Sequence, residues 1–170
     1  MSEPRQLRCY QYVTVDYDRV REALRKDAVG IFQRATATAA SRAHELASTL
    51  RVSVGALEIG ADVQISVREV SDKQSPLGDR RTELELAWSA SSASALFPSM
   101  EATLSVYPLS AHETQLDLHG RYKPPLGAVG KALDVLVGHR IAEASVLRFV
   151  QEVAARITAE LGAATATGGR

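Results

Sequence analysis

Aromatic residues and cysteine are scarce in this chain of 170 residues: aromatic side chains make up 5% of it, and Cys9 is its single cysteine. One thiol excludes an intrachain disulfide framework and a zinc site built from cysteines, and the lack of disulfides agrees with a reducing compartment. No run reaches the roughly 18 continuous apolar residues that a membrane-spanning helix needs, and residues 1–5 are polar where a signal peptide would be apolar. We therefore expect a soluble, cytoplasmic protein without stable membrane insertion.

An excess of either charge is also missing, since 20 Lys and Arg residues balance 20 Asp and Glu residues. A nucleic-acid-binding domain is usually clearly basic, so this balance argues against a nucleic-acid partner. A net charge of zero eases self-association, which leaves a homodimer open. The length suits one domain with a sizeable core, and 45% of the residues are hydrophobic.

Apolar and polar residues alternate with period two through the middle of the chain. This pattern predicts strands with one apolar face and one wet face, as in an antiparallel sheet. The predicted strands are residues 50–56, 63–67, 84–88, 100–106 and 114–122, preceded by a Tyr- and Val-rich strand within residues 7–17. Loops are predicted at residues 72–81, which contain Pro76 and Gly78, and at residues 89–98.

Segments with helical periodicity lie near the start of the sequence and after the last predicted strand. Residues 20–47 predict two consecutive helices, or one helix broken near Gly30. Residues 126–161 carry the longest helical pattern, and at ~1.5 Å per residue such a helix would run roughly 50 Å across the sheet. Strands with helices segregated to one face predict an α+β fold. We expect residues 1–6 to be a flexible lead-in, residues 7–161 to form one domain and residues 162–170 to be a disordered tail.

This order of elements resembles the helix-grip fold of the START/Bet v 1-like (SRPBCC) superfamily, which includes polyketide cyclase/dehydrase-like proteins and lipid-transfer domains. The resemblance rests on residues 95–98 (ALFP), 116–127 (LDLHGRYKPPLG) and 139–143 (HRIAE), where a last strand passes through a proline turn into a closing helix. It implies a curved antiparallel sheet of six or seven strands around the long C-terminal helix, with two shorter helices after the first strand. It also implies a cavity between sheet and helix for a hydrophobic or amphipathic molecule.

The inward phase of the strands and the apolar stripe of the long helix give the expected wall of this cavity. Aliphatic walls with a few aromatic or hydroxyl groups suit a small-molecule pocket, although the same residues also suit a filled core. The expected wall residues are Val54, Val63, Ile65, Val67, Leu84, Leu86, Trp88, Leu104, Val106, Leu118, Tyr122, Leu133, Val137, Arg140, Ile141 and Ala144.

Three of these residues carry polar groups. Arg140 falls near the middle of the apolar stripe on a helical wheel, and a guanidinium there needs a partner because an unpaired buried charge is costly. That partner is either a ligand carboxylate or enolate, or a carboxylate of the protein, unless the charged head snorkels to water. Trp88 lies either in the wall of the cavity, with its indole N–H available for a hydrogen bond, or in a filled core. Tyr122 has a hydroxyl for a ligand hydrogen bond.

Recognisable catalytic motifs are missing, since no GxSxG, phosphate-loop or GxGxxG pattern occurs. The four histidines show no zinc spacing, and His139 falls on the polar side of its helical wheel, so we expect neither metal nor cofactor. The leading hypothesis is a protein that binds or carries a lipid-, polyketide- or isoprenoid-like molecule without turnover. One alternative is a cyclase/dehydratase-type enzyme that uses Arg140, Tyr122 or Trp88. Another is a protein-interaction module with a filled core and an exposed apolar patch.

Overall fold

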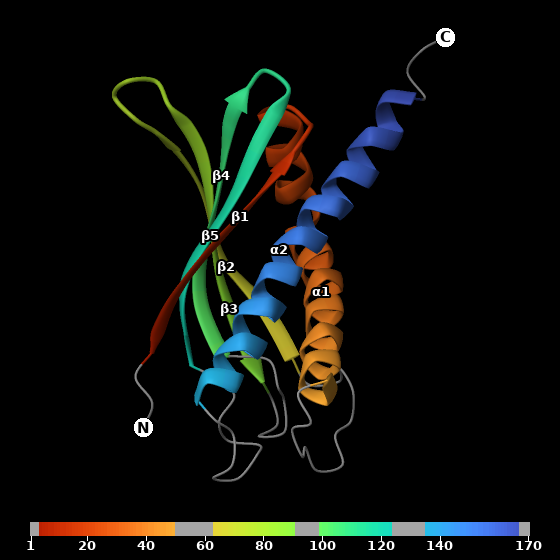
Figure 1. Ribbon diagram of the computed structural model, residues 1–170. Helices are drawn as coiled ribbons and strands as arrows, with labels where there is room; N and C mark the ends of the chain where they lie inside the picture. The colour runs from red at the N-terminus through yellow and green to blue at the C-terminus, as the bar shows by residue number, and fades with distance from the viewer. Residues whose placement is uncertain (1–3, 50–62, 91–98, 124–134, 167–170) are drawn as a thin grey trace.

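One twisted antiparallel sheet carries two long helices on one of its sides (Figure 1). The computed structural model describes residues 4–49, 63–90, 99–123 and 135–166. The elements are β1 (Arg5–Val13), α1 (Tyr17–Thr49), β2 (Val63–Gln74), β3 (Arg80–Ala90), β4 (Ser99–Ser110), β5 (Glu113–Lys123) and α2 (Val135–Ala166). The sheet order is β1-β5-β4-β3-β2. The α+β class is therefore confirmed, but the described residues form five strands rather than six or seven, and the strand predicted at residues 50–56 lies outside them.

The period-two pattern places one face of the sheet against the helices. In β3, Leu84, Leu86 and Trp88 are buried, while Glu85 and Ala87 between them point to the other face. A β-bulge between Val67 and Glu69 brings Val70 opposite Leu84 on this inner face. The bulge explains why the simple alternation of β2 breaks after Val67.

The hairpin between β2 and β3 is longer than the sequence predicted. Both strands extend into the expected loop at residues 72–81, and the turn itself is closed by a backbone bond from Ser75 N–H to the Asp79 carbonyl at 2.8 Å. Gly78 adopts a φ of 90°, which only glycine takes up readily. The Ser75 hydroxyl accepts bonds from the backbone N–H groups of Leu77 and Asp79. The Ser75 side chain thus stabilises a tight turn at a position where the sequence predicted a longer irregular loop.

Helix α1 is kinked, in agreement with the predicted break, but at Asp27 rather than at Gly30. Asp27 has a non-helical backbone (φ −146°, ψ 44°), and its carboxylate accepts a hydrogen bond from the Gly30 N–H at 3.0 Å. This is the geometry of an N-cap, so Asp27 ends one helical segment and begins the next.

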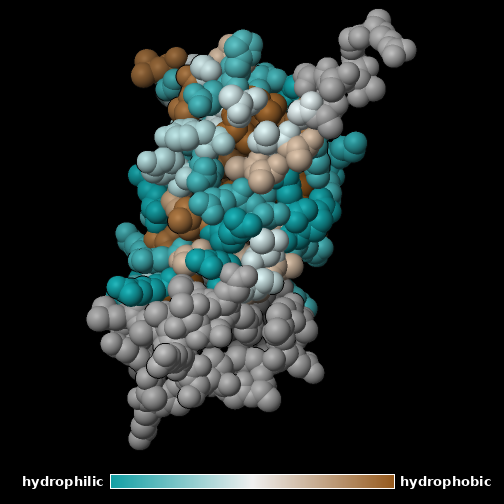
Figure 2. All heavy atoms as spheres, turned by 45° about the vertical axis from the view of Figure 1, so that its right-hand side comes forward, coloured by the Kyte–Doolittle hydropathy of each residue, from teal (hydrophilic) through white to brown (hydrophobic). Residues whose placement is uncertain are grey.

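Helix α2 runs to Ala166, so residues 162–166, which were predicted to belong to a disordered tail, are helical. Its buried stripe is Ala142, Val146, Phe149, Val150, Val153 and Ile157. No helix in the described parts of the chain combines the length and hydrophobicity that membrane crossing requires. On the side of the molecule seen in Figure 2, small groups of apolar side chains lie among mostly hydrophilic ones.

Candidate functional site

A row of buried side chains crosses the inner face near one end of the sheet. Tyr122 on β5 pairs with Met100 on β4, Met100 pairs with Trp88 on β3, and Trp88 pairs with Ile65 on β2. Each of the four lies within two residues of a strand end, and each is at most 8% exposed. The start of α2 lies beside the end of β5 at this same end of the sheet (Figure 1). The row therefore combines a phenol, a thioether, an indole and an aliphatic side chain, all of them buried.

Tyr122 meets a histidine from α2. The Tyr122 hydroxyl and Nδ1 of His139 are hydrogen-bonded, and the two rings stand edge to face with centroids 5.6 Å apart. Tyr122 is 1% exposed and His139 is half-buried. The second ring nitrogen of His139, Nε2, is buried and has no hydrogen-bond partner among the described residues. We call Met100, Tyr122 and His139 the Tyr122 site.

The phenol of this site is held in its neutral form. Burial raises the pKa of Tyr122 above its ordinary value, the negative charge of Glu143 raises it further, and the positive charge of Arg5 opposes them. A neutral phenol keeps its O–H proton, which is the group that can donate to an imidazole nitrogen. The site is thus a hydrogen-bonded phenol–imidazole pair in which the second imidazole nitrogen, Nε2 of His139, has no hydrogen-bond partner among the described residues.

Beyond Met100 the interior is filled by aromatic rings. The Trp88 and Phe149 rings meet edge to face at 4.8 Å, and Phe32 lies 5.9 Å from Phe149. The Trp88 indole N–H donates to the Thr36 hydroxyl at 3.1 Å. In this structure the indole N–H of Trp88 therefore forms a hydrogen bond that joins β3 to α1.

The expected wall residues fall into four groups. Fully buried residues are Ile65, Leu84, Leu86, Trp88, Leu104, Val106, Leu118, Tyr122 and Ile141. Val67 and Ala144 are half-buried, and Arg140 is exposed. Val54 and Leu133 lie outside the described residues, and the side chains of Val63 and Val137 lie outside the described side chains. Burial agrees with a wall or with a core alike, so the assignment of these residues to a ligand cavity stays a prediction.

The helical wheel of α2 was wrong at its two polar positions. Arg140 is exposed, and it precedes the buried Phe149 by nine residues, about two and a half turns, which puts the two on opposite sides of the helix. His139 precedes the buried Val146 by about two turns and shares its side. The predicted apolar stripe extends to Ala144 and Leu147, which are half-buried and 40% exposed in the structure, whereas the Val146–Phe149–Val153 spacing alone identifies His139 as inward.

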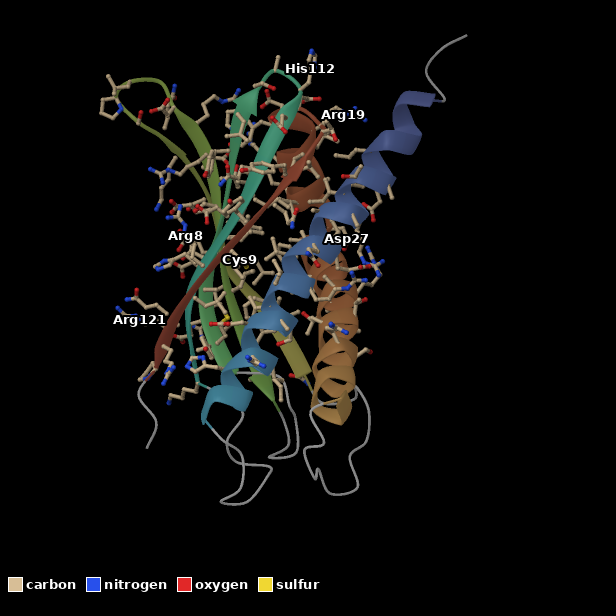
Figure 3. The ribbon with its side chains drawn as sticks, in the orientation of Figure 1. Arg8, Cys9, Arg19, Asp27, His112 and Arg121 are labelled. Carbon is tan, nitrogen blue, oxygen red and sulfur yellow. The ribbon has the colours of Figure 1, made fainter. Side chains whose placement is uncertain are left out.

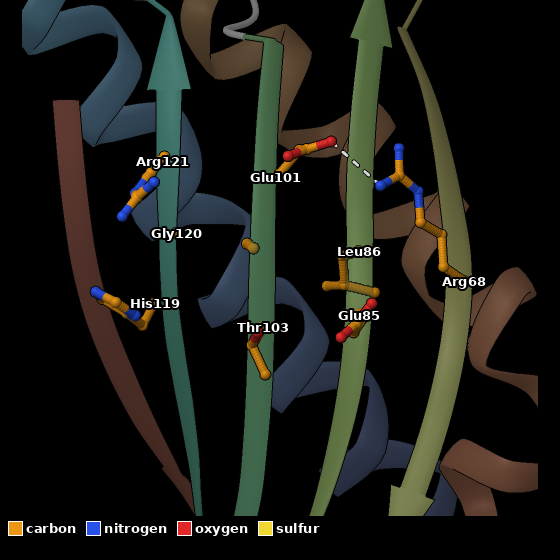
Figure 4. Close-up of a pocket in the computed structure, with 9 residues that line it drawn as sticks. Arg68, Glu85, Leu86, Glu101, Thr103, His119, Gly120 and Arg121 are labelled. Carbon is orange, nitrogen blue, oxygen red and sulfur yellow. Dashed lines mark hydrogen bonds and ion pairs between the residues drawn. The ribbon is translucent and has the colours of Figure 1, made fainter. Parts of the chain in front are cut away.

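Two surface hollows lie away from this interior. The first, about 290 Å³, opens on the outer face of the sheet beside Arg68, Glu101, His119 and Arg121 (Figure 4). Arg68 and Glu101 form an ion pair of 3.1 Å there, and such exposed pairs contribute little free energy. Arg121 and Arg8 point away from the helices (Figure 3).

The second hollow, about 500 Å³, lies between α1 and α2 beside Ser41, Leu147 and Arg148. No group of three or more metal-binding side chains occurs among the residues that the structure describes. We therefore place the candidate site at the interior Tyr122 site.

Comparison with known proteins bears on the fold. No protein-family model and no curated protein matches the chain. The Zhui aromatase/cyclase from Streptomyces sp. R1128 superposes with a TM-score of 0.52 and 17% identity, over 99% of this chain and 100% of that chain. A conserved protein from Geobacillus kaustophilus gives a TM-score of 0.47 at 12% identity, over 92% and 97% of the two chains. Norcoclaurine synthase from Thalictrum flavum gives 0.41 at 10% identity, over 91% and 87%.

These findings establish the architectural class. The chain shares the fold of the aromatase/cyclase, and it has the helix-grip order of strands and long helices that the sequence predicted. At 17% identity the likeness concerns the fold, and the function has to be argued from the side chains of the site.

Proposed function

We propose that this protein binds a hydrophobic or amphipathic small molecule, of lipid-, polyketide- or isoprenoid-like character, between the inner face of the sheet and α2. The observation that carries the proposal is the buried Nε2 of His139, which has no partner among the described residues and lies beside the neutral phenol of Tyr122. Ligand sites are mostly apolar walls with a few convergent polar groups. The Tyr122 site has this composition.

The position within the interior follows from packing. The rings of Phe32, Phe149 and Trp88 pack together under the helices, on the side of Met100 away from Tyr122. His139 precedes Phe149 by ten residues, about 15 Å along α2. The ligand site is therefore confined to the end of the sheet where β5 finishes, rather than extending along the whole helix.

The first test uses 2-acetylnaphthalene as a probe and the methyl group of Met100 as a reporter. The chain has two methionines, so the Met100 methyl signal is assigned by comparing the wild type with Met100→Leu. We expect a saturable shift of this signal, because an aromatic probe packed against Met100 adds a ring-current field. The methyl of Thr103, half-buried on the outer face of the same strand, should not move.

A matched pair of variants on β4 locates the site independently. Met100→Trp adds bulk beside Tyr122 and should weaken probe binding at least tenfold, whereas Thr103→Trp adds comparable bulk to the outer face and should leave probe binding unchanged. Circular dichroism checks that both variants fold. Absence of any saturable shift in the wild type, or equal loss in both variants, would contradict the proposal.

A cyclase/dehydratase-type enzyme is the second candidate, and the Tyr122–His139 pair favours it because histidine and tyrosine are common general acids and bases. The acetyl methyl of 2-acetylnaphthalene is enolisable. An acid–base site would exchange its protons for deuterium in D₂O, measurable by NMR, and His139→Phe would abolish the catalysed exchange. Binding of 2-acetylnaphthalene without catalysed deuterium exchange supports a carrier. Failure of the probe to bind supports the third hypothesis, an interaction module with a filled core.

A further inference from the structure

We infer that His139 donates its Nε2–H to a neutral oxygen acceptor on the bound molecule, so that the ligand is an apolar body ending in a carbonyl. This inference rests on the proposed function and specifies the chemical class of ligand that the Tyr122 site selects. It follows from the tautomer that the hydrogen bond with Tyr122 imposes.

The tautomer is set by the proton of the phenol. The Tyr122 hydroxyl has one proton, and Nδ1 of His139 is its hydrogen-bond partner among the described residues. If the phenol donates, Nδ1 accepts through its lone pair, and the imidazole proton of a neutral ring then sits on Nε2. The reverse arrangement would leave the phenol proton without an acceptor among the described residues, in a side chain that is 1% exposed.

The remaining Nε2–H is a buried donor. Buried polar groups in proteins nearly always have a partner, and the exceptions mark unseen water, ions or functional sites. Leaving such a donor unpaired destabilises the folded protein, and a ligand oxygen that accepts from it removes that penalty. An apolar ligand without an acceptor gains nothing at this position.

The charges around the pair favour a neutral acceptor over an anion. Glu143 lies one turn beyond His139 on α2, and its negative charge raises the pKa of Tyr122, while Arg5 on β1 opposes it. The guanidinium of Arg140 is exposed and stands on the far side of the helix from the buried stripe. Because the charge of Glu143 has a larger effect on the phenol than the charge of Arg5, a carboxylate buried here would gain no net positive charge, and burying an uncompensated charge is costly. A carbonyl oxygen has no such requirement.

The experiment compares two probes of one shape. 2-Acetylnaphthalene carries a C=O where 2-isopropenylnaphthalene carries a C=CH₂, so the pair isolates the acceptor, and 2-naphthoate supplies the anion. We expect the wild type to bind the ketone about three- to tenfold more tightly than the alkene, the ratio that one neutral hydrogen bond supports, and to bind 2-naphthoate more weakly than the ketone.

Three variants assign this preference to His139. His139→Phe keeps the ring bulk and should bring the ketone-to-alkene ratio to about one without weakening the alkene. His139→Gln keeps an N–H donor and should retain part of the ratio. His119→Phe, an exposed position on the outer face, should change nothing. The ¹⁵N spectrum of the wild type should show His139 protonated at Nε2 at neutral pH.

The outcomes separate the two proposals. If neither the ketone nor the alkene binds, the proposed function fails. If both bind equally well to the wild type, or if the His139 proton resides on Nδ1, the proposed function survives and the inference about the carbonyl is overturned. A variant that loses its folded spectrum leaves the tautomer and the wild-type ratio as the deciding measurements.

Discussion

Trp88 on β3 and Thr36 on α1 are hydrogen-bonded across the interior, with the indole nitrogen 3.1 Å from the threonine hydroxyl and both residues nearly inaccessible to water. Replacing Thr36 by valine keeps its shape and removes its hydroxyl. We expect this change to lower the free energy of unfolding by about 1 kcal/mol, the usual net contribution of one neutral hydrogen bond. Urea unfolding followed by circular dichroism measures the loss.

Thr38→Val is the matched control on the same helix. The Thr38 hydroxyl bonds back to the Arg34 carbonyl at 3.3 Å, so its removal should cost less than about 0.5 kcal/mol. The chain has one tryptophan, whose indole N–H resonance should shift in Thr36→Val and stay in place in Thr38→Val. Equal losses of stability in the two variants would show that the contact between β3 and α1 does not stabilise the fold.

Gly120 allows β4 and β5 to approach closely beside the Tyr122 site. A Cβ atom at this position would lie 2.5 Å from the Glu101 carbonyl oxygen and 2.6 Å from the Ala102 Cβ. Backbone atoms of a central strand cannot move aside cheaply, so Gly120→Ala should destabilise the protein by roughly 1–3 kcal/mol.

A second glycine provides a control with the opposite sign. Gly162 lies in α2 with no atom within 4 Å of a Cβ placed there, so Gly162→Ala should stabilise the helix by up to about 1 kcal/mol. Thermal unfolding of both variants tests the pair. A Gly120→Ala variant as stable as the wild type would mean that β4 and β5 are not held at this separation.

The N-terminal end of α1 is tied to the β2–β3 hairpin by a chain of hydrogen bonds. The Thr82 hydroxyl donates to the Asp72 carboxylate at 2.8 Å and accepts from the buried Tyr17 hydroxyl at 2.8 Å. Burial alone would raise the pKa of Asp72, but the bonds from Thr82 and Arg25 and the charges of Arg21 and Arg25 outweigh it and hold this pKa below its ordinary value.

A lowered folded-state pKa fixes the direction of the pH dependence. The Asp72 carboxylate stabilises the fold above about pH 4, its ordinary pKa, and this contribution is lost as the pH falls through the lowered value. The difference in unfolding free energy between the wild type and Asp72→Asn should therefore shrink between pH 7 and pH 3. A difference that grows on acidification would contradict the assignment.

Thr82→Val removes the hydroxyl that joins the other two groups. It should raise the pKa of Asp72 toward its ordinary value, followed by the ¹³C shift of its carboxyl, and leave the Tyr17 hydroxyl without its acceptor at a cost of about 1–3 kcal/mol. Tyr17→Phe is the control, because it removes the other neighbour of Thr82 while the bond to Asp72 remains. It should leave the pKa of Asp72 almost unchanged.

Sequence patterns predicted the parts of this fold that depend on local alternation. Leu84, Leu86 and Trp88 were assigned to the inner face of one strand and are all buried there, because period-two patterning and the pleat of a strand have the same repeat. The break of α1 was also predicted, although the N-cap at Asp27 moved it from Gly30. Aspartate is a preferred N-cap residue, so Asp27 directly before the apolar Ala28 is a helix-start signal that can be read from the sequence.

The site was less accessible to prediction because it depends on which side of α2 faces the sheet. A wheel error of one residue is about 100°, enough to exchange His139 for Arg140. Tyr122 lies on the inward phase that the alternation predicts, and the spacing of Val146, Phe149 and Val153 places His139 inward, but the pairing of Tyr122 with His139 follows only from the packing of α2 on the sheet. The hydrogen bond between them joins two elements and leaves no local pattern in either one.

Cys9, on β1, provides a test of how dry the inner face is (Figure 3). Burial raises the pKa of its thiol to about 12, and the charge of Asp117 adds to the shift. A thiol with a pKa near 12 is about one part in ten thousand thiolate at pH 8, against about a quarter for an ordinary cysteine. Because the thiolate is the reactive form, the native protein should react with dithionitrobenzoate at least about a hundredfold more slowly than the same protein unfolded in urea.

Asp117→Asn should accelerate the reaction of the native protein only slightly, since burial is the larger cause of the raised thiol pKa. A native rate within tenfold of the unfolded rate would show that water reaches the inner face of β1.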